Sequence, residues 1–483
     1  MIGAALLALA AHPCIACHPK EVAGYAQTGM ARSLARPADE PGGSFTHALS
    51  GSRFNIVRGS AGLRMRLDRA GLSAEYPVAF AIGSGAQGHS YVVQIGEYLF
   101  QAPASYYASR RAWDVSPGYE RDRSPDFDRP VTPECLFCHG TSNREAISCE
   151  RCHGPAEAHL ARPVAGNIVN PVRLSPRARD SVCEQCHLAG EARVLNPGRT
   201  FQDFTPGREL EEVFSVYRKP TGDNFKVVSQ VEQLALSRCA RASGGRMWCG
   251  SCHDPHEKSA NYRQRCRTCH GQAPLAKHPA PAEDCIGCHM PRRASSDIAH
   301  TSFTDHRIVR RPRNAGEAAP PVKLVAWREP PPALARRNQG LAYISVGERD
   351  QAAALLNEGF RLLAGLEKES ARDPDVLTAL GLVLLRKGRT AEALRMFEQA
   401  ARAEPSARNL LNLAVAQDRA AQTAAAIRNL ERAIDLDPSL ERAYGLLATK
   451  QPQRRRELLE RYLRFNPQSL TARRALQQAP PVR

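Results

Sequence analysis

One short motif recurs seven times in the 483-residue chain and constrains its fold more than any other feature. Each copy reads Cys-x-x-Cys-His, and the copies begin at residues 14, 135, 149, 183, 249, 266 and 285. Together they use fourteen of the fifteen cysteines and leave only Cys239 outside. Residues at i and i+3 lie on one side of a helical turn, and i+4 follows beside them. Each copy therefore presents two sulfurs and one imidazole to a single ligand.

This spacing is the attachment signature of c-type haem, in which both thiols bond to the porphyrin and the His binds the iron. A Cys-x-x-Cys pair is also half of a zinc site, but zinc sites do not require a His after every second Cys. The motif predicts seven covalently attached haems. The thioether residues would be Cys14, Cys17, Cys135, Cys138, Cys149, Cys152, Cys183, Cys186, Cys249, Cys252, Cys266, Cys269, Cys285 and Cys288. The proximal iron ligands would be His18, His139, His153, His187, His253, His270 and His289.

The second axial ligand decides what each haem can do. A haem with a second protein ligand only passes electrons, whereas an open iron can bind a substrate. An isolated His is more often a surface or core residue than a ligand. If His12 at the expected cleavage site is set aside, however, as many histidines as haems remain outside the motifs. The distal candidates are His47, His89, His159, His256, His278, His300 and His306, with Met30 as a thioether rival.

The distribution of residue types predicts four segments. Residues 1–11 are apolar and are expected to be the end of a signal peptide, although a short buried helix is the alternative. Residues 12–310 hold every motif and are expected to form the seven-haem cytochrome c domain. Residues 311–333 are rich in proline and predict a stiff linker. Residues 334–478 lack cysteine and are expected to form a separate helical domain.

Hydrophobic patterning refines the expected fold. Within 45–103, apolar residues alternate around glycine turns, which predicts a small antiparallel β insertion. The motifs follow one another closely, so we expect a mainly α domain with extensive loops and a core packed by haems. Beyond the linker, small residues and prolines repeat at tetratricopeptide spacing, as in Gly381, Ala393 and Pro405. That repeat predicts an α-solenoid, with a plain helical bundle as the alternative.

Charge and compartment restrict the possible partners. The formal net charge is +17, of which +10 lies in residues 311–483. Haem propionates would neutralise much of the rest, and no basic stripe interleaved with aromatics predicts nucleic-acid binding. Because c-type haem is attached outside the bacterial cytoplasm, the chain is expected to be exported, to the periplasm for example. No apolar run after the signal region is long enough to span a membrane.

The chain resembles bacterial multihaem c-type cytochromes that carry C-terminal tetratricopeptide repeats. The resemblance covers nearly the whole chain and rests on FTHALSG (45–51), AIGSG to SYVV (81–93), WDVSPGYE (113–120), CLFCHG (135–140), CERCHGPAEAH (149–159), IVNP (168–171), VCEQCHLAG (182–190), SRCARASGGRMWCGSCHDPH (237–256), CIGCHMP (285–291) and DIAHTSFTDHRI (297–308). The last cysteine motif is also similar to one in the nitrite reductase and hydroxylamine oxidoreductase superfamily. The resemblance implies stacked haem pairs with mostly bis-His ligation, and it places His47, His159, His256, His300 and His306 at ligand positions.

These observations favour an electron carrier over a catalytic enzyme. In this interpretation seven haems pass electrons between redox partners, such as other cytochromes or a membrane quinol-linked complex, and the repeats dock a protein. An alternative is a multihaem oxidoreductase that acts on a small nitrogen or sulfur compound at one five-coordinate haem. In a third interpretation the repeats carry the main function, and the cytochrome senses redox state or anchors them.

Overall fold

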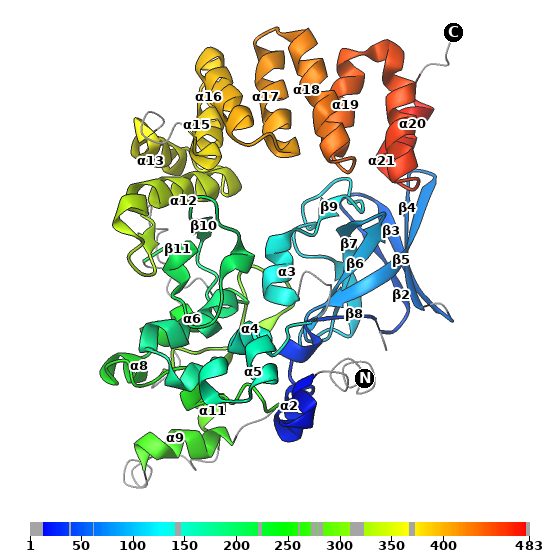
Figure 1. Ribbon diagram of the computed structural model, residues 1–483. Helices are drawn as coiled ribbons and strands as arrows, with labels where there is room; N and C mark the ends of the chain where they lie inside the picture. Colours follow the sequence, from blue (N-terminus) through cyan, green and yellow to red (C-terminus); the bar gives the residue numbers. More distant parts are fainter. Residues whose placement is uncertain are drawn as a thin grey trace.

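The computed structural model describes residues 13–37, 40–60, 62–140, 146–220, 225–258, 261–271, 278, 284–309, 323–366 and 372–479. It has three parts: an antiparallel sheet, a region of short helices that carries most of the cysteine motifs, and an arch of paired helices (Figure 1). The expected signal segment, residues 1–11, and about half of the expected linker, residues 311–322, lie outside the described residues.

The first part is a nine-stranded antiparallel sheet, in which seven strands follow chain order from β2 to β8. Apolar residues alternate along the central strands Ser52–Gly59 and Gly62–Arg69, so one face of each of these two strands is buried. The short β1 pairs with β5, and β9 pairs with β7. The strands are β1 (Leu34–Ala35), β2 (Gly43–His47), β3 (Ser52–Gly59), β4 (Gly62–Arg69), β5 (Leu72–Ile82), β6 (Gly88–Ile95), β7 (Tyr98–Tyr107), β8 (Ala112–Val115) and β9 (Arg129–Pro130).

The sheet curls into a nearly closed barrel because β8 returns to lie against β2. Trp113 on β8 donates from Nε1 to the carbonyl of Pro41, 3.0 Å away. Its ring covers Gly43, where a Cβ would lie 2.6 Å from the indole, so a larger residue would push β2 away. The interior is filled by fully buried side chains, including Phe54 and Tyr91.

The fold expected for residues 12–310 is therefore wrong. A mainly α domain with a haem-packed core and a small β insertion at 45–103 was expected, but a barrel-like sheet runs from β1 to β9. The physical reason is that alternating strands bury their own apolar face. This large side-chain core extends beyond the predicted segment, because Tyr119 and Phe127 also contribute to it.

The second part joins short helices to a three-stranded sheet. A separate apolar cluster in this part includes Phe137, Leu188 and Phe214. The helices are α2 (Pro19–Tyr25), α3 (Pro133–His139), α4 (Glu150–His153), α5 (Glu157–Ala161), α6 (Pro176–His187), α7 (Gln230–Leu236), α8 (Arg238–Ala242), α9 (Tyr262–His270) and α11 (Cys285–His289). The strands are β10 (Ala192–Leu195), β11 (Phe214–Arg218) and β14 (Val325–Ala326), and β12 (Arg292–Ala294) pairs separately with β13 (Ser302–Thr304).

The third part is an arch of antiparallel helix pairs, which confirms the tetratricopeptide prediction. Small residues let the helices of a pair approach closely: a Cβ at Gly381 would lie 2.8 Å from the Phe397 ring. The helices are α12 (Ala335–Arg349), α13 (Ala353–Leu363), α15 (Pro374–Arg386), α16 (Thr390–Ala403), α17 (Ala407–Arg419), α18 (Thr423–Leu436), α19 (Glu441–Lys450), α20 (Arg455–Phe465) and α21 (Leu470–Gln477). We refer to α12 to α21 as the solenoid.

The C-terminal end of the solenoid rests on the barrel. Leu470 is buried in the barrel core, and Phe465 packs against Tyr98 with ring centroids 5.4 Å apart. The Gln468 amide bonds both ways with the backbone of Glu75, accepting from its N–H at 2.7 Å and donating to its carbonyl at 2.5 Å. Asp126 accepts from the backbone N–H of Leu470, 3.1 Å away, at the start of α21. This contact is thus both apolar and hydrogen-bonded.

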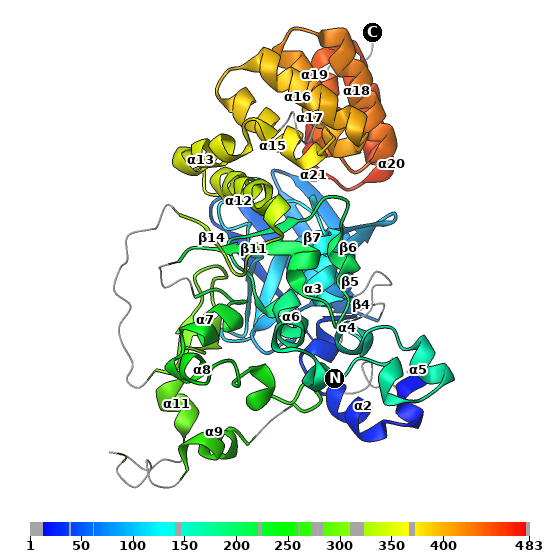
Figure 2. The same cartoon turned by 60° about the vertical axis from the view of Figure 1, so that its left-hand side comes forward.

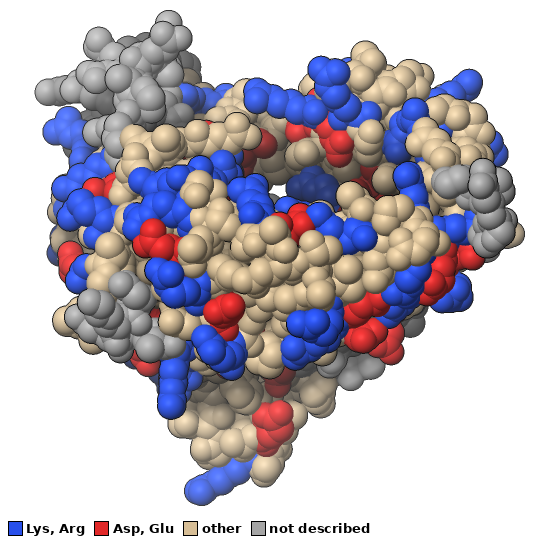
Figure 3. All heavy atoms as spheres, turned by 90° about the horizontal axis from the view of Figure 1, so that it is seen from above, with Lys and Arg blue, Asp and Glu red and all other residues tan. Residues whose placement is uncertain are grey.

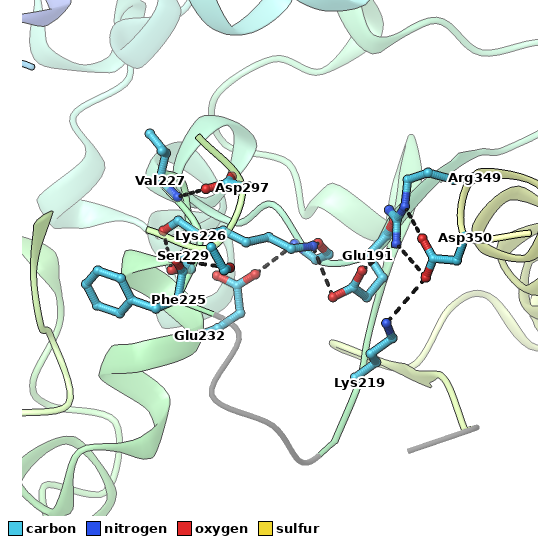
Figure 4. A network of polar contacts seen from close by, with 12 residues as sticks. Glu191, Lys219, Phe225, Lys226, Val227, Ser229, Glu232, Asp297, Arg349 and Asp350 are labelled. Atoms are coloured by element: carbon cyan, nitrogen blue, oxygen red, sulfur yellow. Dashed lines mark hydrogen bonds and ion pairs between the residues drawn. The ribbon is translucent and has the colours of Figure 1, made fainter. Parts of the chain in front are cut away.

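The N-terminal end of the solenoid is attached to the second part of the molecule. Asn338 on α12 donates to Asn196 at 2.9 Å and to Ser215 at 3.1 Å. Figure 4 shows the ionic side of this attachment, where Arg349 reaches Glu191 at 2.7 Å and Lys226 pairs with the same carboxylate at 3.0 Å. Burial raises the pKa of Glu191, but its cationic neighbours outweigh that effect and hold the pKa below its usual value.

The solenoid therefore bridges the molecule and is fixed at both ends, as the second view makes clear (Figure 2). Seen from above, this side of the molecule carries many Lys and Arg side chains and is hollowed at one place (Figure 3). Among the described residues, no helix combines the length and the apolar character needed to cross a bilayer.

Candidate functional site

The cysteine motifs adopt the local geometry that their spacing predicts. In three of them the N–H of the motif His donates to the carbonyl of the first Cys: His18 to Cys14 at 2.8 Å, and His153 to Cys149 and His253 to Cys249 at 2.9 Å. This is the i to i+4 bond of one helical turn. Both sulfurs and the imidazole of each motif thus leave the backbone on neighbouring sides of one turn.

All seven motifs open into one continuous cavity of about 2890 Å³. A pocket for a single drug-sized ligand measures about 300–1,000 Å³, so this space is several times larger. The seven motif histidines and every motif cysteine except Cys17 line it. Its wall also includes the barrel face formed by β6 and β7, for example at Tyr106. The fold brings together motifs that are up to 271 positions apart in numbering, from Cys14 to Cys285.

Motif histidines face non-motif histidines in four pairs. Ring centroids lie 6.5 Å apart for His18 and His159, 5.9 Å for His153 and His256, 6.2 Å for His253 and His306, and 6.0 Å for His289 and His278. An imidazole nitrogen binds a metal ion at about 2 Å, so two imidazoles on opposite sides of one ion place their centroids about 6 Å apart. Each pair has the spacing of two axial ligands of one ion.

Hydrogen bonds at Nδ1 hold several of the cavity histidine rings in place. Nδ1 lies within hydrogen-bond distance of an oxygen that can only accept in six cases: His153 to Val169 (2.8 Å), His289 to Val309 (2.8 Å), His159 to Val164 (3.1 Å), His306 to Thr304 (2.9 Å), His256 to Asp254 (3.1 Å) and His89 to Glu40 (3.1 Å). In the neutral imidazole the hydrogen therefore sits on Nδ1 and leaves Nε2 bare. Metal-binding histidines are typically held in this way.

Burial keeps several of these imidazoles neutral. It lowers the pKa of His139, His153, His187, His253 and His306, because the charged imidazolium loses its hydration. Only the neutral form has a lone pair to give to a metal ion. Electrostatics and geometry thus favour the same state of these side chains.

The distal-ligand candidates fall into two groups, those that line the cavity and those that do not. Met30, His89, His159, His256, His278 and His306 line the cavity. His47 lies outside the residues that line it, and its Nδ1 is 2.9 Å from the hydroxyl of Ser50. His300 is also outside the lining, and its Nε2 lies 2.9 Å from Arg110 and 3.3 Å from Asp114. For His47 and His300 the ligand role therefore stays a prediction without support from the geometry.

Three motif histidines, His139, His187 and His270, have no facing imidazole within the part of the chain that the structure describes. Met30 and His89 are the remaining cavity candidates for them. Met30 lies near the second motif, because the hydroxyl oxygen of Ser33 is 2.8 Å from the carbonyl oxygens of both Met30 and His139 and can donate to either.

The motifs also lie close to one another. Thiols of different motifs shift one another's pKa between the first and third motifs (Cys14 and Cys149) and between the second and fourth (Cys138 and Cys186). Further pairs join the fourth to the fifth (Cys183 and Cys249) and the sixth to the seventh (Cys266 and Cys285). The motifs therefore form a connected series of adjacent sites.

Sequence reasoning missed the residues that support these rings. Glu40 precedes its partner His89 by almost fifty positions, and no local signal joins them. The carbonyls of Val169 and Val309 are backbone groups that no residue type predicts. Within the described ranges, no three or more His, Cys, Asp or Glu side chains converge as the ligands of a bare metal ion would.

Comparison with known proteins identifies one part of the chain. Residues 374–406 match the tetratricopeptide repeat family, so the C-terminal region contains at least one such repeat. The chain matches no curated protein sequence.

The similar solved structures are tetratricopeptide proteins, and the likeness is confined to a part of the chain. MamA is 20% identical, with 29% of this chain and 80% of that chain covered and a TM-score of 0.26. YrrB, described as a TPR protein with an unusual peptide-binding site, is 17% identical over 30% of this chain and 79% of its own, with a TM-score of 0.25. A Thermobaculum terrenum O-GlcNAc transferase mutant is 20% identical over 27% of this chain and 26% of its own, with a TM-score of 0.24.

Proposed function

We propose that the protein is an electron carrier with seven covalently attached c-type haems in its cavity. The observation that carries this proposal is the set of four imidazole pairs at 5.9–6.5 Å, each made of one motif His and one distant His. A zinc site would recruit cysteines and histidines of neighbouring motifs to one ion. The opposed pairs, with two cysteines beside each, fit a flat macrocycle between two axial ligands instead.

The chain's own residues would hold each group in a defined way. The two cysteines of a motif would form thioethers, and the motif His would bind the iron from one side. His159, His256, His306 and His278 would complete the first, third, fifth and seventh sites, respectively. Backbone carbonyls and the carboxylate of Asp254 keep the Nδ1 hydrogens of these distal or proximal rings in place. The haems would supply reversible one-electron chemistry.

The order of the sites supports transfer along a chain. Sulfur contacts join the first site to the third, the fourth to the fifth, and the sixth to the seventh. Cys152 lies within electrostatic range of Cys183, and Cys252 of Cys269, which links these pairs into one series. The second site joins at the fourth through Cys138 and Cys186. We infer a line of sites 1–3–4–5–6–7 with site 2 as a branch.

The solenoid is proposed to dock a protein partner of this relay, such as another cytochrome or a quinol-linked complex. Its attachment favours such a role, because Glu191 both lines the cavity and pairs with Arg349 of the first repeat. Export, to the periplasm for example, is part of the proposal, since covalent haem attachment takes place outside the bacterial cytoplasm.

A second function is favoured by the three motif histidines that have no facing imidazole among the described residues. If Met30 and His89 complete two of these sites, a third keeps an iron that is open on one side. An open iron would let the protein act as an oxidoreductase on a small nitrogen or sulfur compound. A stoichiometric high-spin signal that shifts on addition of nitrite, hydroxylamine or cyanide would favour this function over simple electron transfer.

Haem stoichiometry tests the main proposal. The chain would be produced in a bacterium that matures c-type cytochromes, and haem would be counted by pyridine haemochrome absorbance and intact mass. We expect seven haems in the native protein and six in Cys149→Ala/Cys152→Ala. Cys239→Ala, which removes the thiol outside the motifs, should keep all seven. A soluble native chain without covalent haem would contradict the proposal.

A further inference from the structure

The sixth motif differs from the other six in its charge surroundings. Every other motif has an Asp or Glu within four residues: Glu21, Glu134, Glu150, Glu184, Asp254 and Asp284 in chain order. The sixth has none, and residues 258–282 contain five basic residues and no acidic one. Haem propionates alone do not explain this difference, because each of the seven sites would bring its own pair.

The sixth motif also lies on an exposed element. Helix α9 has no buried residue, and its Cys269 and His270 are exposed. It lies at the end of the molecule opposite the solenoid in both views (Figures 1 and 2). The position therefore gives an incoming molecule access to this motif.

Helix α9 carries three arginines, Arg263, Arg265 and Arg267. Arg265 and Arg267 line the cavity, so they can face propionates, whereas Arg263 is outside the cavity lining and is exposed. None of the three side chains makes a hydrogen bond or an ion pair with any residue in the described ranges. Among the described residues, no carboxylate therefore pairs with these arginines.

The exposed helix is connected directly to the inner sites. The hydroxyl of Tyr262, the first residue of α9, lies 3.4 Å from Nδ1 of His253 in the fifth motif. Cys266 contacts Cys285 of the seventh motif. An electron that arrives at the sixth site is therefore next to two further sites.

We propose that α9 is the docking surface for an acidic redox protein, which exchanges electrons with the chain at the sixth site. The inference rests on the proposed haem-carrying function and adds the place and the chemistry of one partner. A partner with carboxylates around its redox group would be steered to the arginines, and such steering raises association rates at low ionic strength. In each exchange the partner loses one electron and the cytochrome gains it.

The probe is flavodoxin in its hydroquinone form, a small acidic flavoprotein that becomes a semiquinone as it gives up one electron. Stopped-flow absorbance would follow reduction of the full-length holoprotein at several salt concentrations. We expect the second-order rate to fall steeply with salt. In Arg263→Glu/Arg265→Glu the low-salt rate should fall about tenfold or more and lose most of its salt dependence. The matched control, Arg395→Glu/Arg402→Glu on solenoid helix α16, should behave like the native protein.

Other results would overturn the inference in distinguishable ways. A native preparation without haem would remove the proposed function and this inference together. Seven haems, full reduction by dithionite and an unchanged flavodoxin rate in the α9 variant would overturn this inference alone. A slower rate in the α16 control would move the docking site to the solenoid. Loss of binding to anionic phosphatidylglycerol vesicles in the α9 variant, without any loss of flavodoxin rate, would assign the arginines to a lipid surface.

Discussion

Glu441 places a carboxyl group at the contact between the last repeat and the barrel. It accepts hydrogen bonds from Ser469 at 3.4 Å and Tyr462 at 3.5 Å. Burial, and then the negative charge of Asp126 and Asp128, raise the pKa of Glu441 to about 7. Its usual value is 4.5, so the folded state binds this proton more tightly than the unfolded state does.

The sign of the resulting pH dependence follows from the raised pKa. A charged Glu441 costs stability, so its effect is absent below pH 4.5, grows as the pH rises to about 7, and is constant above that. Glu441→Gln should match the native protein near pH 4 and exceed its stability by up to about 3 kcal/mol at pH 8. Urea unfolding followed by circular dichroism measures both values. Glu398→Gln on α16 is the control, and an equal difference at both pH values would contradict the assignment.

Two histidines of one sequence segment are predicted to behave differently. His306 faces His253 at 6.2 Å, whereas the Nε2 of His300 lies 2.9 Å from Arg110. His306→Ala should convert one iron from low spin to high spin at unchanged haem content, and His300→Ala should leave the electron paramagnetic resonance spectrum as it is. The reverse result would show that the ring spacing does not report ligation.

Residue types predict which side chains can serve as ligands, but pairing depends on the fold. The number of non-motif histidines gives a set of candidates, and six of the eight distal candidates do line the cavity. That His159 faces the first motif rather than the nearby third is set by long-range packing. Neither spacing nor residue type contains this information. For the same reason, the sequence alone does not distinguish His47 and His300 from the histidines that line the cavity.

Among the helices of the solenoid, one glycine position has no room for a side chain and another has open space around it. A Cβ at Gly381 would meet the Phe397 ring at 2.8 Å, while a Cβ at Gly445 on α19 would meet nothing within 4 Å. Gly381→Ala should destabilise the solenoid by about 1–3 kcal/mol through overpacking. Gly445→Ala should stabilise it by about 0.5–1 kcal/mol because alanine favours a helix. Thermal unfolding monitored by circular dichroism compares them, and similar effects of both changes would contradict the packing of α15 on α16.

The elements were predictable where a local pattern sets them. Alternating residues around Gly96 predict the hairpin that β6 and β7 form, and the repeat spacing predicts the paired helices. The closure of β8 on β2 was not predictable, because it depends on Trp113 lying over Gly43, seventy residues earlier in the chain. Expecting cofactors to supply the core led to the wrong fold class, although the apolar alternation already contained a side-chain core.

The whole molecule is a closed arrangement in which the solenoid is held at both ends. Leu470→Asp would place a charge in the barrel core beside Asp126, at a cost of about 2–4 kcal/mol to the contact. The C-terminal end should then leave the barrel. Small-angle X-ray scattering should show a larger radius of gyration with unchanged helix content. Leu436→Asp, at an exposed position on α18, is the control, and an unchanged radius in Leu470→Asp would contradict the role of this contact.

In each paired site of the cavity, one haem is proposed to bind through a cysteine motif and a facing imidazole. The most direct measurement is electron paramagnetic resonance of the oxidised protein, with haem content determined on the same sample after production in a host that matures c-type cytochromes. Seven haems per chain, with low-spin signals for at least the four paired sites, are predicted. A folded chain with no covalent haem, or one in which high-spin iron predominates, would contradict the proposal that these imidazole pairs are axial ligands.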